Sequence, residues 1–229
     1  MESVDIWYLS LPCLAGVGLG AWGALHPKSQ LFGPTVRDAG NACALTFDDG
    51  PNPRATPQVL SLLEKYKVQA TFFMLGKYVR ENPGLAAEIA ARKHVIGNHS
   101  DTHPNLLFLS RRLIVYELRR CEDSIHTATG LRSSVVRPPF GFRGPQFGSA
   151  AREAGFKRIV MWSLSAKDWK SQEWQKISNR LKNVRRGDIL LFHDGDHRIA
   201  NADRTHTLQA LDYWLPRWLD SGFSFVSIG

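Results

Sequence analysis

Apolar positions fall into short runs that alternate along the chain with longer amphipathic stretches. The short runs are typical of buried strands, and the longer stretches repeat apolar residues every three to four positions, as helices do. The strand-like runs occupy residues 43–47, 70–74, 94–97, 135–137, 158–162, 189–192 and 223–228, and the helix-like stretches occupy residues 56–66, 83–92, 110–129, 145–154, 172–182 and 205–220.

This alternation favours a parallel sheet with helices outside it. Seven strand-like runs within residues 43–228 favour a closed barrel over an open sheet. We therefore predict an α/β fold, a distorted (β/α)7 barrel of parallel strands that follows an N-terminal apolar segment.

The first part of the chain has another pattern, because residues 6–25 carry no charge. A twenty-residue helix spans roughly 30 Å, enough to cross a membrane. One proline and four glycines would weaken this helix, and Glu2 and Asp5 stand where a secretory signal would be basic. We predict that residues 1–41 form an apolar segment and linker ahead of one domain over 42–229. The segment would be a membrane anchor or, alternatively, a buried or interfacial hairpin, and its orientation stays open.

Composition narrows the function classes. A hydrophobic share of 43% with 22% charged residues excludes a disordered or collagen-like chain. The three cysteines, Cys13, Cys43 and Cys121, form no CxxC pair and are too few for a disulfide framework. The net charge of +8 would suit an anionic surface such as phospholipid head groups. No basic stripe interleaved with aromatic residues appears, so we predict no nucleic-acid partner, and we predict no protein partner.

Titratable side chains follow one strand-like run after another. Asp48 and Asp49 follow the first run, His99 lies just beyond the third, Arg137 ends the fourth and His193 follows the sixth. The active sites of parallel-strand barrels gather at the C-terminal strand ends. We therefore expect these side chains to converge on one face.

The spacing of His99 and His103 would place two imidazoles on one side of a helical turn. A carboxylate from another strand could complete a metal site with two histidines. Taken alone, a histidine pair of this spacing is more often a pair of surface or capping histidines, and Asp48 and Asp49 are equally compatible with a turn that caps the next helix. A buried pair of carboxylates needs a nearby cation, which a metal or Arg137 would supply.

As a set, these residues resemble the polysaccharide deacetylase family, the NodB homology domain of carbohydrate esterase family 4. The resemblance runs in order from residue 42 to residue 229. It rests on five motifs: TFDDGP at 46–51, HSDTHP at 99–104, RPPFG at 137–141, DW at 168–169 and ILLFH at 189–193. In one departure, Ser165 stands where the family often has an Asp, three residues before DW, which affects substrate contacts more than the chemistry.

The resemblance implies a metal centre. Asp49, His99 and His103 would hold a divalent metal, most commonly Zn²⁺ in this family, with Co²⁺ or Ni²⁺ as alternatives. Residues 42–229 would then be a NodB-like deacetylase domain.

The resemblance also implies an acid and a base. Asp48 would be the general base, steered by an ion pair with Arg137, and His193 would be the general acid, hydrogen-bonded to Asp168. Such a carboxylate holds an imidazole in one tautomer and supports its protonated form.

Three further positions would contact the substrate. Trp169 and Leu191 would shape the pocket for the acyl methyl group, and the backbone N–H of Phe140 would help to hold the oxyanion.

We therefore expect a metal-dependent hydrolase that removes N-acetyl groups from N-acetylglucosamine-containing glycans, either chitin-like oligosaccharide or peptidoglycan. An alternative is a deacylase or deformylase of a lipid-linked amino sugar, which the apolar residues 6–25 and the basic charge would suit. A membrane lipid would then be a partner besides the carbohydrate, and the protein would be membrane-associated. An alternative from another class is an inactive glycan-binding module, which has no use for both a metal site and an acid–base pair.

Overall fold

The structure is a computed structural model that describes residues 16 and 18–229. Its single sheet has seven strands, all paired in parallel, in the order β5-β4-β3-β2-β1-β7-β6. The strands are β1 (Ala44–Gly50), β2 (Ala70–Met74), β3 (Val95–Asn98), β4 (Val135–Val136), β5 (Arg158–Ile159), β6 (Leu164–Ser165) and β7 (Ile189–His193). The predicted class, an α/β fold built on a distorted barrel of parallel strands, is confirmed.

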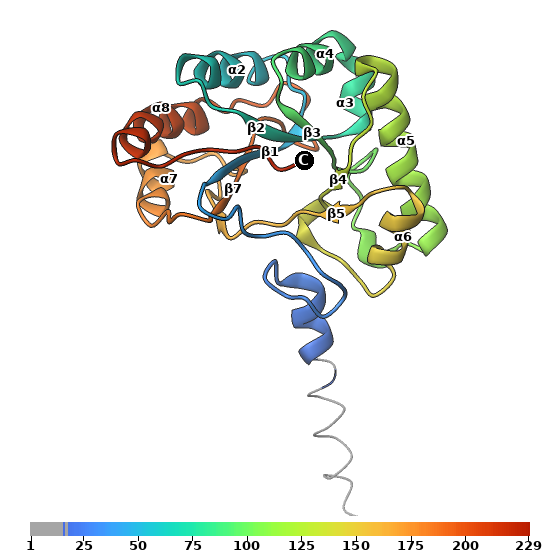
Figure 1. The fold of residues 1–229 in the computed structure, drawn as a ribbon. Coiled ribbons are helices and arrows are strands. Elements are labelled where there is room, and N and C mark those ends of the chain that lie inside the picture. Colours follow the sequence, from blue (N-terminus) through green and yellow to red (C-terminus); the bar gives the residue numbers. More distant parts are fainter. Residues whose placement is uncertain (1–15, 17) are drawn as a thin grey trace, which may run out of the picture.

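Helices cover the outside of the curled sheet on all but the lower side of the view, where the N-terminal linker runs (Figure 1). They are α2 (Thr56–Lys65), α3 (Gly76–Glu81), α4 (Pro83–Ala91), α5 (Arg111–Thr129), α6 (Phe147–Glu153), α7 (Trp174–Leu181) and α8 (Thr205–Asp220), with short 3₁₀ turns η1 (Leu106–Phe108) and η2 (Pro139–Gly141). Six of these helices match the predicted stretches to within about two residues. The six-residue α3 was not predicted, because so short a helix carries little periodicity.

The sheet curls into a half-barrel, and its closure is incomplete. β5 and β6 are the two edge strands, and no ladder joins them within residues 18–229. Only residues 160–163 separate them, whereas parallel neighbours need a connection of about a dozen residues. Part of the linker spans the opening, where Val36 pairs with Val160 beyond β5 and Asp38 pairs with Asp188 just before β7.

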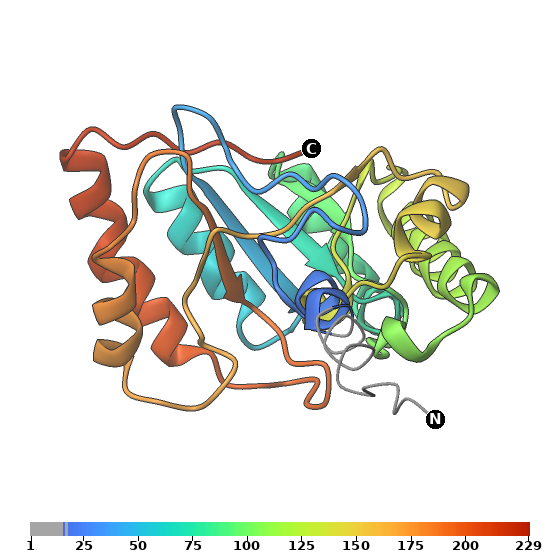
Figure 2. The ribbon, with the colours of Figure 1, turned by 90° about the horizontal axis from the view of Figure 1, so that it is seen from below.

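The strand predicted over 223–228 does not form. Phe225 makes one isolated bridge to Cys43, and the N–H of Ile228 donates to the side chain of Thr71 instead of to a strand backbone. The segment runs past the N-terminal ends of the strands (Figure 2) and places Ile228 in the apolar cluster inside the half-barrel. The seventh strand is instead the two-residue β6, which is too short for an alternating pattern.

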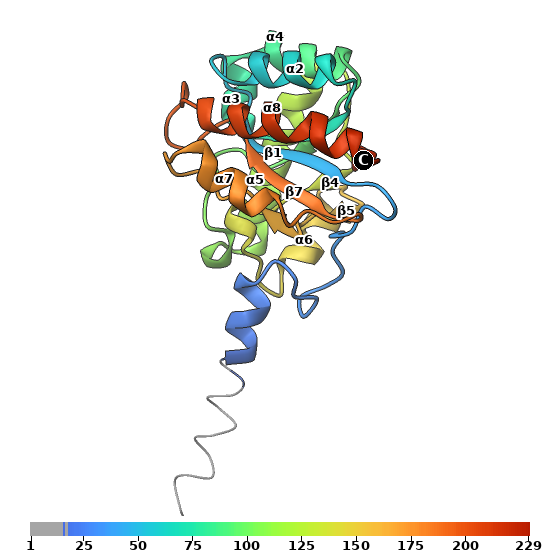
Figure 3. The same cartoon turned by 90° about the vertical axis from the view of Figure 1, so that its left-hand side faces the viewer.

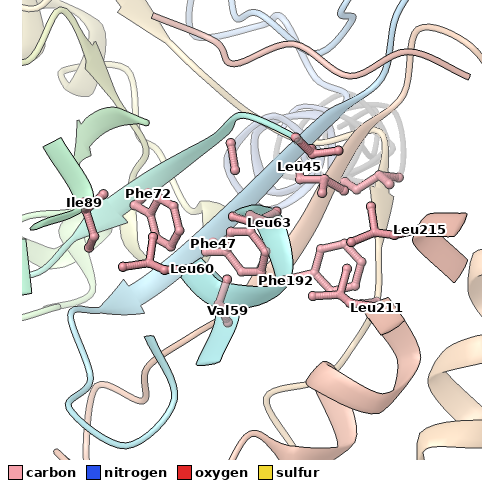
Figure 4. Packing of buried hydrophobic residues seen from close by; sticks show 14 of the residues in the cluster. Leu45, Phe47, Val59, Leu60, Leu63, Phe72, Ile89, Phe192, Leu211 and Leu215 are labelled. Atoms are coloured by element: carbon pink, nitrogen blue, oxygen red, sulfur yellow. The ribbon is translucent and has the colours of Figure 1, made fainter. Parts of the chain in front are cut away.

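Alternate side chains of the central strands face opposite sides of the sheet. On the outer side, Leu45 and Phe47 of β1 pack with Phe72 of β2 and Phe192 of β7 against apolar side chains of α2 and α8 (Figure 4). The Phe47 ring stacks on Phe72 and Phe192 at centroid distances of 5.1 and 5.8 Å. Figure 3 shows α2 and α8 lying along this outer side. The inner side is free to carry polar residues.

The chain before the sheet contains a helical stretch over residues 18–25, which extends away from the half-barrel (Figure 1). The N–H of Arg143 donates to the carbonyl of Ala24 at 3.0 Å, and the buried guanidinium of Arg143 donates to the carbonyl of Ser29. Among the described residues, no helix combines the length and the apolar character that a membrane span requires. Much of the predicted anchor 6–25 lies outside the described residues, and the boundary at residue 42 stays a prediction.

Candidate active site

The residues predicted at the strand ends line one pocket of about 530 Å³. Eight of the ten predicted site residues contribute to its wall: Asp48, Asp49, His99, His103, Phe140, Trp169, Leu191 and His193. The other two lie behind the wall: Arg137 pairs with Asp48, and Asp168 pairs with His193. The expected convergence at the C-terminal strand ends is therefore observed.

A β-bulge separates the two neighbouring carboxylates. Asp48 aligns with Phe73 of β2 and Gly50 with Met74, so Asp49 is the extra residue in β1. Asp49 also has a positive φ of 70°, in the left-handed region. A bulge re-aims side chains, and here Asp48 turns toward Arg137 while Asp49 turns toward the two histidines.

Asp49, His99 and His103 offer three ligand atoms that lie within 4.8 Å of one another. Asp49 Oδ1 is 3.3 Å from His103 Nε2 and 3.6 Å from His99 Nε2. This oxygen is buried and has no hydrogen-bond partner among the described residues. His99 Nδ1 donates to the carbonyl of Arg137 at 2.8 Å, which leaves the lone pair of Nε2 free to bind a metal. An orphaned oxygen facing two imidazole nitrogens fits a divalent metal site.

The two histidines do not share a helical turn, so that part of the prediction is wrong. Both lie in the loop between β3 and η1, and Ser100 and His103 have positive φ values of 70° and 64°. Pro104 disfavours the helical conformation for the residue before it, His103. The loop still brings the two rings to a centroid distance of 5.1 Å.

The charge states around Asp49 suit metal ligation. Burial lowers the pKa of His103 to about 3, so its imidazole is neutral, as a ligand must be. Burial raises the pKa of Asp49, but the surrounding histidines, His197 first, outweigh that effect and hold the pKa below its ordinary value. The Asp49 carboxylate is therefore ionised.

Arg137 fixes Asp48 through a buried ion pair. Arg137 Nη1 lies 2.7 Å from Asp48 Oδ1 and also donates to the hydroxyl of Thr46 at 2.8 Å. The guanidinium is fully buried and lies over the Phe73 ring, 4.1 Å from its centroid. Asp48 Oδ2 faces His99 Nε2 at 3.6 Å, so the second carboxylate oxygen points into the pocket.

Asp168 orients His193 in the same way. Its Oδ1 lies 2.8 Å from His193 Nδ1, and its Oδ2 accepts from the backbone N–H of His193 and the hydroxyl of Thr207. Burial lowers the pKa of His193, but the Asp168 charge and hydrogen bond more than offset it and raise the pKa to about 9. Burial likewise raises the pKa of Asp168, yet His193 holds it below its ordinary value. The pair is therefore a carboxylate and an imidazolium near neutral pH.

The three predicted substrate residues surround these groups. The Phe140 ring stands edge-on to His103 at 4.4 Å, and the Trp169 ring stands edge-on to His193 at 5.7 Å. Both rings are more than 40% exposed, whereas Leu191 is buried in β7. Phe140 has a positive φ of 59°, a backbone strain of the kind that recurs at ligand sites. The pocket thus has an apolar floor at Leu191 and an aromatic rim.

Two features of the site were not predicted. One is a clamp on the loop between His99 and His103: Arg80 and Arg120 bind the buried carboxylate of Asp101, and Glu117 accepts from the N–H groups of Asp101 and Thr102. No local pattern marks this clamp, because its members come from α3, α5 and the loop.

The other feature is His197, which follows β7 and contacts Asp49 and His103. The signal that could have found it is its spacing, since His197 follows His193 by four residues, as His103 follows His99. It also lies beyond the end of a central strand, where functional side chains gather.

Comparisons with known proteins define the class. A family model described as polysaccharide deacetylase matches residues 35–159. A peptidoglycan-N-acetylglucosamine deacetylase of Bacillus cereus is 36% identical over 193 residues, which are 81% of this chain and 85% of that protein. A chitooligosaccharide deacetylase of Sinorhizobium fredii is 36% identical over 210 residues, which are 88% of this chain and 94% of that protein. The chain belongs to the polysaccharide deacetylase family.

A solved structure agrees with this assignment. The Bc1960 peptidoglycan N-acetylglucosamine deacetylase superposes with a TM-score of 0.76 at 31% identity, covering 85% of this chain and 89% of that one. The family model ends at residue 159, before Asp168 and His193, so the pairing of these two residues is known from the geometry described above.

Proposed function

We propose that this protein is a metal-dependent hydrolase that removes N-acetyl groups from N-acetylglucosamine-containing glycans, either chitin-like oligosaccharide or peptidoglycan. One observation supports this most directly: a three-ligand metal site shares a pocket with a carboxylate held by Arg137 and an imidazolium held by Asp168. The two relatives named above act, by their names, on these two kinds of glycan.

Asp49, His99 and His103 would hold the divalent ion. Zn²⁺ accepts one carboxylate and two imidazoles with a position left open, and Co²⁺ and Ni²⁺ accept similar donors. Such an ion supplies a Lewis acid for the amide carbonyl and lowers the pKa of water from 15.7 to about 7. The three residues would fix its place beside Asp48.

Asp48 would act as the general base. Arg137 occupies Oδ1, so Oδ2 is the oxygen available to accept a proton from the attacking water. Positioned bases of this kind contribute on the order of 10² to 10⁴ in rate. The buried guanidinium also keeps the carboxylate from rotating away during turnover.

His193 would donate a proton to the departing amine nitrogen. Asp168 holds Nδ1, which leaves Nε2 as the acid, and the pKa of about 9 keeps that acid protonated near neutral pH. Leu191 and the Trp169 ring would receive the acetyl methyl beside it, and the Phe140 N–H would donate to the oxyanion.

The test is mass spectrometry of the products from N-acetyl and N-formyl sugars, free and lipid-linked, with and without chelator. We expect free N-acetylglucosamine oligomers to lose acetyl groups, and chelator followed by added Zn²⁺ to abolish and restore that loss. Full activity after exhaustive chelation would refute the metal assignment. Glycan binding with no release of acetate or formate from metal-loaded protein would instead support a binding module.

A second candidate is the removal of an acyl or formyl group from an amino sugar carried on a membrane lipid. The uncharged run 6–25 favours it, as do the exposed side chains of Leu19, Trp22 and Leu25 in the helical stretch. Membrane association through residues 6–25 is part of this proposal. A lipid-linked substrate would then be processed much faster than the free oligosaccharide of the same sugars.

A further inference from the structure

His197 lies in the loop that connects β7 to α8 and covers one side of the metal site. Its ring stacks on the ring of His103 with centroids 4.1 Å apart and an angle of 17° between the planes. The Phe140 ring stands edge-on to it at 5.5 Å. The side chain is 24% exposed, so it is mostly enclosed by these neighbours. The His197 ring therefore packs against a face of the His103 ring, whereas the Phe140 ring contacts His103 edge-on.

His197 also faces the outer oxygen of Asp49. Asp49 Oδ1 points at His99 and His103, whereas Oδ2 lies 3.7 Å from His197 Nδ1. Arg198 Nε donates to His197 Nε2 at 3.1 Å, so the ring proton resides on Nδ1, the nitrogen that faces Asp49. At 3.7 Å the contact is an electrostatic attraction between the N–H and Oδ2, too long for a hydrogen bond. This attraction favours an orientation of the carboxylate in which only Oδ1 faces a cation.

The backbone holds His197 in this place. Lys77 Nζ donates to the carbonyl of His197 at 2.6 Å, and the hydroxyl of Tyr78 donates to the carbonyl of Asp196 at 2.8 Å. Gly195 lies against the Asp49 backbone so closely that a Cβ there would come within 1.8 Å of the Asp49 carbonyl oxygen. The loop is therefore locked onto the bulge of β1 and onto α3.

We propose that His197 is a positioning residue of the metal centre: its ring buttresses His103, and its Nδ1–H holds Asp49 so that Oδ1 alone binds the cation. The proposal rests on the metal site of the proposed function. Groups that orient metal ligands typically contribute 10- to 100-fold to metal affinity.

The test measures metal binding without any substrate. The dissociation constant for Zn²⁺ is determined by competition with a chromophoric chelator, and Co²⁺ alone serves as a probe of coordination through its visible spectrum. We expect His197→Ala to weaken Zn²⁺ binding by about 10- to 100-fold. His197→Phe keeps a stacking ring but no N–H, and its loss should be smaller. His126→Ala removes an exposed histidine of α5 and should leave the affinity unchanged.

Two results would overturn the proposal. One is an affinity of His197→Ala within twofold of the unchanged chain, in protein whose circular dichroism and melting temperature show an intact fold. The other is loss of a ligand from the Co²⁺ spectrum of His197→Ala, which would make His197 a direct ligand. A chain that binds metal in the expected order of affinities but releases no acetate would refute the proposed function and leave this inference standing.

Discussion

On the side of the sheet that faces α2 and α8, β1 and β7 present Leu45, Phe47 and Phe192 to an apolar layer. On the inner side, the residues next to them in sequence, Asp48 and His193, belong to buried ion pairs. Both sides are buried, so burial alone does not decide whether a side is apolar or charged. The two sides differ in the partner residues that the curvature of the sheet brings to each.

The comparison shows two ways of using a buried strand. The outer side gains free energy from apolar area removed from water, about 25 cal/mol per Å². The inner side bears the desolvation of charges, which Arg137 and Asp168 offset only with well-placed hydrogen bonds. Substitutions of the apolar residues on the outer side should therefore reduce stability, whereas substitutions of the polar residues on the inner side should reduce activity.

Asp48→Asn should have the largest effect, and that effect should be a loss of activity. The amide cannot accept the proton, so we expect kcat to fall by about 10² to 10⁴, with one equivalent of metal still bound. Its neighbour gives the matched comparison, because Asp49→Ala should lose the metal itself. Elemental analysis of both variants, alongside kcat, measures the contrast. Loss of metal from Asp48→Asn would show that Asp48 is needed for metal binding too, so that the bulge does not separate a base from a metal ligand.

Phe47→Ala should give the largest effect on stability. The ring is fully buried between Phe72 and Phe192, so its removal should lower the free energy of unfolding by about 3–5 kcal/mol. Denaturant titration measures this, and kcat of the folded fraction should stay within about threefold. The control is Phe108→Ala, since Phe108 is 84% exposed and its loss should cost no more than about 0.5 kcal/mol.

Asp168→Asn should move the pH profile. His193 must be protonated to act as the acid, and its pKa of about 9 means that the acid form is lost as pH rises through 9. Without the Asp168 carboxylate, the largest effect that opposes burial is lost and the pKa of His193 falls, so the alkaline limb of kcat should shift to lower pH. At pH 8 we expect a loss of about 10- to 100-fold. Asp203→Asn, an exposed acid in the segment before α8, should leave the limb in place.

Thr46→Val should give the smallest effect of the four. The hydroxyl accepts from Arg137 and donates to the carbonyl of Leu190, both in the buried interior. Without it, the unfolding free energy should fall by about 1–2 kcal/mol, and kcat by a few-fold as Arg137 loses one anchor. Thr46→Ser retains the hydroxyl and should recover most of both losses. A loss in Thr46→Ser that is absent from Thr46→Val would show that the methyl group, rather than the hydrogen bond, matters.

Much of the fold could be predicted because the pattern is local. The apolar runs of β1 and β7 and the periodicity of α5 and α8 appear in consecutive residues, and the observed bounds differ little from those expected. β6 and the C-terminal segment could not be predicted in this way. A two-residue strand has no pattern, and residues 223–228 resemble a strand but, among the described residues, form only the single bridge between Phe225 and Cys43.

The sequence by itself determined which side chains would meet: carboxylates, imidazoles and an arginine, each at or just beyond the C-terminal end of a parallel strand. Only the tertiary structure decided what each would do there. The bulge at Asp49, the left-handed backbone at His103 and the place of His197 depend on contacts between distant segments. Asp48 and Arg137, for example, are 89 residues apart. Local preferences cannot encode such geometry, because the packing of the whole half-barrel imposes it against those preferences.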